Sequence, residues 1–310
     1  IGPASGCSVL PRCAQPPESP PHYRHRTPEE AYTLSSEQRN VAYSRAATEP
    51  RENTAMLMAV DIGNTNIVIG FLEGERIVGS YRITTKALHT SDEYTVMISQ
   101  FLQISGYTRR DVEDVIVCSV VPKVMHSFRA SIIKFLGFEP MVVGPGIKTG
   151  INIHMDDPKT MGADCLTDCV GAYYTYGGPV LVADFGTATT FNYVDGKGTI
   201  RAGYITTGIR AGAEALWGQT AQLPEVEIVR PKSILATNTR SAMQAGLYYT
   251  FLGGIERTVQ QFREEIGEPF KVVTTGGLGR IFKDDTDVID VYDPDLIFKG
   301  MALIYKRNVR

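Results

Sequence analysis

The sequence has no long apolar run and little net charge. No stretch approaches the roughly 20 consecutive apolar residues that a helix needs to cross a bilayer, so we expect no membrane segment. The formal net charge at pH 7 is only -3 over 310 residues. Proteins whose main partner is a nucleic acid present a strongly basic face to its phosphates, and this composition does not suggest one. We therefore expect a partner that is neither a membrane nor a nucleic acid.

Cysteine is scarce and lacks the paired spacing of a disulfide framework. The five cysteines are Cys7, Cys13, Cys118, Cys165 and Cys169. Cys165 and Cys169 are four residues apart, but no further Cys or His pair is present to complete a zinc site with them. We therefore expect reduced thiols, as in a cytoplasmic protein.

The rest of the composition is that of an ordinary globular protein. Hydrophobic residues make up 43% and charged residues 21%, and the length allows two domains with separate cores. Residues 1–55 are rich in Pro, Ser, Arg and Glu, so we predict a disordered N-terminal extension there. They also lack the pattern of a secretory signal. We predict a first domain at 56–178 and a second at 179–310.

The stretch from residue 57 to residue 66 organises the rest of the sequence. A short apolar run leads to Asp61, and Gly63 then allows a tight turn whose small polar side chains and amides face a polyphosphate. The pattern predicts a phosphate-binding turn at the end of a buried strand. Taken alone, it also fits an ordinary hairpin.

A second copy of this pattern lies at residues 180–190. An apolar run again ends in an aspartate, Asp184, which is followed by Gly186 and the hydroxyl residue Thr187. Each of the two turns opens a similar series of elements. The repetition predicts a duplicated domain that holds a nucleotide between its copies.

Strands and helices alternate along the chain, which predicts an α/β fold. Thr90 and Glu93 have the spacing of a capping box, so a helix should begin there. Further strands are expected at 67–71, 76–83, 115–121, 141–143, 190–194, 199–205 and 270–274, and further helices at 123–136, 242–266 and 295–305.

Two other features stand near the expected nucleotide site. The glycines of residues 275–279 permit either close approach to an adenine or ribose or simply a tight strand-to-helix turn. Asp164 stands at the start of a helix between the two copies. It fits either a first-turn charge that is stabilised by the helix dipole, or a general base that takes the proton of a substrate hydroxyl during attack on a γ-phosphoryl group.

With these motifs in this order, the sequence resembles the type III pantothenate kinases of the actin-like ATPase superfamily. The resemblance covers residues 58–307 and rests on the motifs in combination. They are DIGNTN at 61–66, VGPGIKTG at 143–150, GAD at 162–164, DFGTATTF at 184–191, RPKSI at 230–234, NT at 238–239 and TGGLG at 275–279. It implies two duplicated ribonuclease H-like domains, as in acetate and sugar kinases, with the active site in the cleft between them.

The resemblance also implies a reaction and the residues that carry it. The reaction is ATP-dependent phosphorylation of pantothenate to 4'-phosphopantothenate, the first step of coenzyme A biosynthesis, by a homodimer. It implies Asp164 as catalytic base, Asp61 as a magnesium ligand and Asp184 as the ligand of a monovalent cation, K⁺ or NH4⁺. The implied ATP-binding residues are Asp61, Ile62, Gly63, Asn64, Thr65, Asn66, Ile67, Val68 and Thr187. The implied pantothenate-binding residues are Met155, Gly162, Ala163, Asp164, Cys165 and Thr239.

Three positions depart from the family pattern, all on the acceptor side. Cys165 stands where the family commonly has an arginine that pairs with the pantothenate carboxylate, and a thiol cannot make that charged contact. Met155 stands in place of an aromatic residue, and Thr207 in place of a proline. Two alternatives therefore stay open: a kinase of the same fold that acts on another small hydroxylated acceptor, and a nucleotide-binding relative without catalysis.

Overall fold

The first of two β-sheets is built around the strand that leads to Asp61. The computed structural model describes residues 56–309, so the predicted disordered extension lies outside the described part of the chain. The strand order is β3-β2-β1-β4-β5; β1, β2 and β3 pair antiparallel, whereas β4 and β5 are parallel to β1. The strands are β1 (Met56–Ile62), β2 (Asn66–Glu73), β3 (Arg76–Thr84), β4 (Val112–Ser119) and β5 (Met141–Val142).

The second sheet repeats this plan around the strand that leads to Asp184. β7, β8 and β9 pair antiparallel, β10 and β11 are parallel to β7, and the short β6 is added beside β9. The strands are β6 (Asn152–Ile153), β7 (Val180–Phe185), β8 (Ala188–Val194), β9 (Thr199–Thr207), β10 (Lys271–Thr275) and β11 (Val291–Tyr292). The repeated order and pairing confirm the duplicated α/β fold.

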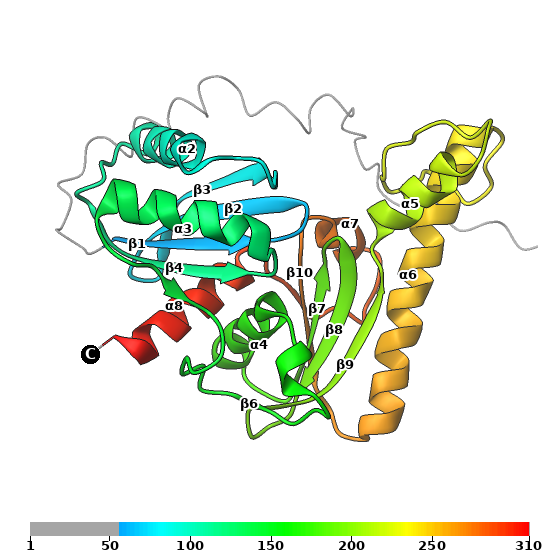
Figure 1. Ribbon diagram of the computed structural model, residues 1–310. Coiled ribbons are helices and arrows are strands. Elements are labelled where there is room, and N and C mark those ends of the chain that lie inside the picture. The colour runs from blue at the N-terminus through cyan, green and yellow to red at the C-terminus, as the bar shows by residue number, and fades with distance from the viewer. Residues whose placement is uncertain (1–55, 310) are drawn as a thin grey trace, which may run out of the picture. The chain divides into compact units, whose positions relative to one another are not determined.

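Helices cover the faces of both sheets (Figure 1). α2 and α3 pack on one face of the first sheet, and α4 and α8 pack between its other face and the second sheet. α5, α6 and α7 cover the remaining face of the second sheet. The helices are α2 (Ser91–Ile104), α3 (Pro122–Leu136), α4 (Ala163–Tyr176), α5 (Ile209–Gly218), α6 (Thr239–Ile266), α7 (Gly279–Lys283), α8 (Leu296–Asn308) and the 3-10 helix η1 (Pro158–Thr160). Within residues 56–309, none is both long and apolar enough to span a bilayer.

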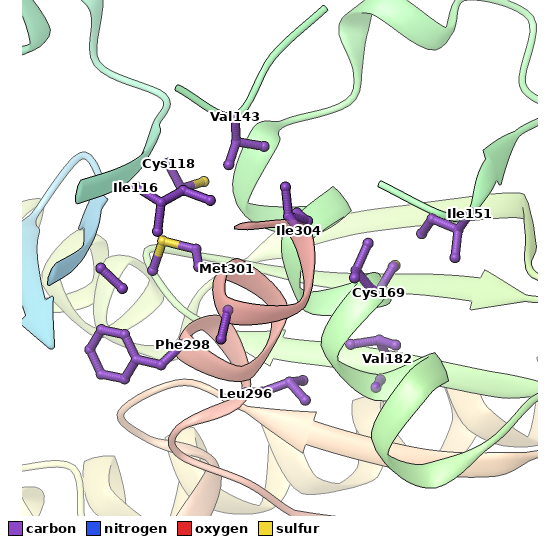
Figure 2. Close-up of a cluster of buried hydrophobic side chains, with 14 of the residues drawn as sticks. Ile116, Cys118, Val143, Ile151, Cys169, Val182, Leu296, Phe298, Met301 and Ile304 are labelled. Atoms are coloured by element: carbon purple, nitrogen blue, oxygen red, sulfur yellow. The ribbon is translucent and has the colours of Figure 1, made fainter. Parts of the chain in front are cut away.

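One buried cluster holds α4 and α8 between the two sheets (Figure 2). It contains Ile116 of β4, Val182 of β7 and Leu296 of α8, so it takes side chains from both sheets. A Cβ added to Gly171 of α4 would lie 2.7 Å from the Leu296 carbonyl oxygen, which shows that the backbones of α4 and α8 touch. Helix α4, which carries Asp164, is therefore fixed in place by packing on several sides.

The ends of several helices follow their capping signals. Thr90 and Glu93 form the predicted capping box of α2, and α3 ends as predicted at Gly137, which is left-handed. α6 begins earlier than predicted, at Thr239, because the Asn238 side chain caps it. α5 and α7 were not predicted. Neither has a side-chain cap at its start, and α7 has only 5 residues.

Candidate active site

The two aspartate-bearing turns meet in the structure. Asp61 lies near the end of β1, and a hydrogen bond of 3.0 Å from the Gly63 N–H to the Asn66 carbonyl oxygen closes the turn that follows. In this turn Thr65 Oγ1 lies 2.8 Å from Thr187 Oγ1 of the turn after β7, within hydrogen-bond distance. The fold therefore places side by side the two similar turns, and the sequence analysis predicted a nucleotide between their two copies.

The carboxylates of Asp61 and Asp184 lie close enough at this junction for the charge of Asp184 to act on Asp61. Asp61 Oδ1 is buried and has no hydrogen-bond partner among the described residues. Burial, followed by the charges of Asp164 and Asp184, raises the pKa of Asp61 to about 7, whereas the Arg82 guanidinium acts in the opposite direction. Burial, followed by the Asp164 charge, likewise raises the pKa of Asp184 to about 7. The site is electronegative and is stabilised by any cation that enters it.

A fourth carboxylate, Asp168, belongs to this group, although the sequence analysis did not identify it. It lies one helical turn after Asp164 on the same face of α4 and is only 4% exposed. Its Oδ1 also lacks a hydrogen-bond partner within residues 56–309. Burial, followed by the charges of Asp184 and Asp61, raises the pKa of Asp168 above its usual range. The four-residue spacing between Asp164 and Asp168 was the one sequence feature that could have indicated that both lie on the same face of the helix.

These residues fit a magnesium–nucleotide complex. The unpartnered oxygens of Asp61 and Asp168 are hard ligands of the kind that Mg²⁺ prefers. Among the described residues, no three His, Cys, Asp or Glu side chains are arranged to hold a metal by themselves. Mg²⁺ is usually bound by one or two carboxylates together with substrate phosphates and water.

Asp164 lies in the first turn of α4, beside the other carboxylates. Gly162 caps the helix, Ala163 is its first residue, and Asp164 Oδ1 accepts a hydrogen bond of 2.7 Å from the Cys165 N–H. The Cys165 sulfur lies 3.7 Å from Thr190 Oγ1 of β8. Burial raises the pKa of the Cys165 thiol to about 12, so the thiol is neutral at pH 7. The GAD motif and Cys165 are thus placed next to the strand that follows the second turn.

The other two predicted acceptor residues come from elements other than α4. Met155 follows β6 and contacts β9, because a Cβ added to Gly203 would lie 3.4 Å from Met155 Cε. Thr239 is the first residue of α6 and lines a hollow of about 840 Å³ between α5 and α6. None of the four aspartates lines this hollow. Within the described part of a single chain, Thr239 is not brought to the carboxylates.

The glycine-rich turn at 275–279 packs directly against Asp184. Gly276 has a φ of 88°, in the left-handed region that favours glycine. A Cβ at this position would collide with the Asp184 carboxylate and the Phe185 backbone. The Tyr292 hydroxyl also donates a hydrogen bond of 3.1 Å to the Gly276 carbonyl oxygen. Packing alone therefore requires glycine at 276, before any ligand is considered.

Comparison with known proteins supplies the family. The family model described as type III pantothenate kinase matches residues 57–261. The type III pantothenate kinase of Bifidobacterium longum subsp. infantis is 82% identical over 255 residues, which cover 82% of this chain and 100% of that protein. The type III pantothenate kinase of Agathobacter rectalis is 49% identical over 256 residues, which cover 82% of this chain and 98% of that protein.

A solved structure shares the fold at low identity. The crystal structure of a Campylobacter jejuni protein described as a Baf family transcriptional activator has a TM-score of 0.50 and 20% sequence identity, and the match covers 81% of this chain and 98% of that one. This similarity concerns the fold alone. The match to the family model and the identity to its members show that this chain belongs to the type III pantothenate kinase family.

Proposed function

We propose that the protein uses ATP to phosphorylate pantothenate to 4'-phosphopantothenate, the first step of coenzyme A biosynthesis. The observation that carries this proposal is the junction of the two turns, where the hydroxyls of Thr65 and Thr187 lie 2.8 Å apart. Asp61 and Asp184 lie at this junction, where burial, followed by the charge of the nearby Asp164, raises the pKa of both. In a chain of this family, such a junction suits a polyphosphate held between the two sheets with a base beside it.

The first turn and Thr187 are the proposed ATP site. Within residues 61–68, backbone N–H groups, the Thr65 hydroxyl and the side-chain amides of Asn64 and Asn66 supply hydrogen-bond donors for phosphate oxygens. Asp61 is the proposed protein ligand of Mg²⁺, which when bound neutralises charge on the phosphoryl oxygens. Four carboxylates would otherwise repel a triphosphate.

Asp164 is the proposed general base. It is half-buried in the first turn of α4, so an acceptor hydroxyl can reach it. It takes the proton of that hydroxyl as the oxygen attacks the γ-phosphorus. The positive end of the helix dipole stabilises the ionised carboxylate that this role requires.

Asp184 is the proposed ligand of a monovalent cation, K⁺ or NH4⁺. Neither turn contains Lys or Arg, so an ion can supply positive charge next to the phosphates. Asp168 interacts with Asp184 and has a buried oxygen without a partner among residues 56–309, which supports a cation between them.

A homodimer is the proposed functional assembly. Leu216, which lines the hollow that contains Thr239, is 37% exposed. Leu235, in the segment before α6, is 84% exposed, and Tyr249 of α6 is 39% exposed. Large apolar side chains gathered in this way are typical of a surface that another protein covers. A second copy seated on α5 and α6 would enclose Thr239, the acceptor residue that lies away from the carboxylates within one chain.

The proposed acceptor pocket combines residues 162–165 with Met155 and Thr239. Cys165 is neutral, so it offers no charge to the pantothenate carboxylate.

We also infer a cytoplasmic location, because Cys118, Cys165 and Cys169 are all free thiols in the structure.

ADP release from ATP, measured with and without pantothenate in K⁺ and in Na⁺ buffers, tests the proposal. We expect release that depends on pantothenate and is faster in K⁺. A parallel screen of other hydroxy acids and sugars tests whether Cys165 has changed the acceptor. If another acceptor supports clearly faster release, the kinase has a different substrate; ATP binding with no transfer to any acceptor would indicate a non-catalytic relative.

A further inference from the structure

We propose that Arg82 of β3 binds the polyphosphate of the nucleotide and is the positive group that the chain itself contributes to the active site. This inference rests on the proposed function, because it assumes that the nucleotide lies at the junction of the two turns. Arg82 is outside every motif that supports the family resemblance. The proposal is based on the position of Arg82 in the first sheet and on the residues around it.

The sheet register aligns Arg82 with Asp61. Asp61 of β1 pairs with Val68 of β2, and Val68 pairs with Arg82 of β3. Residues directly opposite one another on neighbouring strands point to the same face of a sheet. The three side chains therefore form a row on one face, and two strand spacings separate the ends of the row by about 10 Å, within reach of an extended arginine side chain.

The arginine extends from β3 to the turn that packs behind Asp184. A Cβ added to Gly277 would lie 3.4 Å from Arg82 Nη1. The Arg82 charge also acts on the Tyr292 hydroxyl, which is bonded to the Gly276 carbonyl oxygen. Arg82 thus stands between the Asp61 turn and the glycine-rich turn at 275–279, one from each half of the molecule.

The guanidinium is available for a ligand. Arg82 is exposed and makes no hydrogen bond or ion pair with any residue in the described part of the chain. Its charge is nevertheless felt at Asp61, where it opposes the surrounding carboxylates. An arginine whose charge acts on Asp61, but which pairs with no carboxylate among the described residues, is placed to meet an anion that enters the site.

The duplicated fold provides an internal comparison. In the second sheet the corresponding row is Asp184, Thr190 and Ile205. The position that holds arginine in the first half therefore holds an apolar side chain in the second. Arg82 therefore lies in the half whose turn is proposed to hold the phosphates. The repeated sheet does not by itself require a charged residue at this position.

The chemistry of the Arg82 guanidinium favours a phosphate ligand. A guanidinium presents a planar fork of N–H donors that matches two oxygens of a phosphate, and charged hydrogen bonds of this kind are the strong ones. Adenosine has no charge for Arg82 to meet. The interaction should therefore strengthen binding of ATP and ADP without affecting binding of the nucleoside.

Calorimetric titration of ATP, ADP and adenosine into the full chain, in Mg²⁺, tests this role. The variants are Arg82→Gln, which removes the charge, and Arg82→Lys, which keeps the charge but not the fork. Arg110→Gln is the matched control, because Arg110 is an exposed arginine in the loop that precedes β4, outside the proposed site. Thermal unfolding of each nucleotide-free variant checks that it folds.

We expect Arg82→Gln to weaken ATP and ADP binding by about ten- to a hundred-fold, with Arg82→Lys between it and the wild type. Adenosine affinity and the unfolding temperature should not change, and Arg110→Gln should match the wild type. Unchanged ATP affinity in Arg82→Gln, or an equal loss for adenosine, would overturn the role of Arg82. A wild-type chain that binds no ATP at all would instead refute the proposed function.

Discussion

Asp164 and Asp168 lie on the same face of α4, but they differ in burial and therefore in the roles that they can have. Asp168 is enclosed at 4% exposure, whereas Asp164 is half-buried at the start of α4. Only Asp164 is accessible to an acceptor hydroxyl. The general base should therefore be Asp164, and the enclosed Asp168 should act through cations or neighbouring carboxylates.

Asp164→Asn tests this assignment. The amide cannot accept the hydroxyl proton, so kcat should fall by about 100- to 10,000-fold, while ATP binding should stay within a few-fold of the wild type. Steady-state kinetics and calorimetric titration of ATP give the two numbers. A variant that retains kcat would show that another group accepts the proton.

Asp61 makes the stability of the nucleotide-free protein depend on pH. Its pKa is about 7 in the folded state against 3.8 for an ordinary aspartate, so the folded state binds the proton more tightly than the unfolded state does. The stabilising contribution is complete below pH 4 and is lost as the pH rises through 7. Relative to Asp61→Asn, the wild type should lose roughly 2–4 kcal/mol of unfolding free energy between pH 5 and pH 8.5.

Urea denaturation of both proteins without nucleotide or Mg²⁺ measures this difference. Identical pH dependence in the wild type and in Asp61→Asn would contradict the burial of an unpartnered carboxylate at this position. Adding Mg²⁺ at pH 8.5 should restore part of the loss in the wild type only, because the cation then balances the ionised group.

The sequence allowed some of these residues to be predicted and not others. Asp61 and Asp184 each end an apolar run before a glycine, so the local pattern and its repetition predicted their place near the end of a strand. Asp168 lies inside a helix, where a buried and an exposed aspartate look alike in one sequence. Arg82 reaches the site only through the pairing of β1, β2 and β3, and register depends on turn geometry that the sequence does not reveal residue by residue.

At the scale of elements, the turn between β10 and α7 determines where Asp184 points. Gly276→Ala places a methyl group against the Asp184 carboxylate and the Phe185 backbone, at a φ of 88° that alanine rarely adopts. We expect a loss of roughly 2–4 kcal/mol of unfolding free energy and weaker ATP binding. Chemical denaturation and nucleotide titration give both values.

Gly254→Ala is the matched control for Gly276→Ala. Gly254 lies within α6, and a Cβ added there meets no atom within 4 Å. Alanine favours helix over glycine, so this variant should gain about 0.5–1 kcal/mol. If the two variants had the same free energy of unfolding and the same ATP affinity, the turn at Gly276 would not be constrained as the structure indicates.

Elements with strong local signals were the easiest to predict. The capping box at Thr90 and the glycine at 137 marked helix ends correctly, because capping depends on residues close in sequence. α5 and α7 lack side-chain caps, and the two-residue strands β6 and β11 are too short to show a period, whereas β5 was predicted at 141–143. The packing of β6 beside β9 joins segments far apart in the chain, which no local pattern encodes.

At the scale of the whole molecule, the proposed dimer connects the surface over α5 and α6 to activity. Leu216→Asp puts a charge at the edge of the hollow that contains Thr239. It should convert dimer to monomer and lower pantothenate-dependent turnover at least tenfold, because burying an unpaired charge costs several kcal/mol. Light scattering during size-exclusion chromatography measures the mass.

Leu88→Asp is the control for surface charge. Leu88 is 93% exposed and precedes α2 on the first half of the molecule, outside the hollow between α5 and α6. This variant should keep the mass and turnover of the wild type. A wild type that is monomeric and active would contradict the proposed dimer.

The duplication itself could be predicted from two short motifs, whereas the contact between the copies could not. In both motifs an apolar strand leads to an aspartate and then a glycine. The two sheets follow the same strand order. The 2.8 Å approach of Thr65 to Thr187 depends on α4 and α8 filling the space between the sheets, and only the packed structure shows this.

The most direct test of the central claim is to identify the product. The protein is incubated with pantothenate and ATP, and the mixture is followed by ³¹P nuclear magnetic resonance. We expect a new phosphomonoester signal coupled to the protons of a primary carbinol, with ADP formed in equal amount. Release of inorganic phosphate alone, or ATP that stays unchanged in the presence of K⁺ and Mg²⁺, would contradict it.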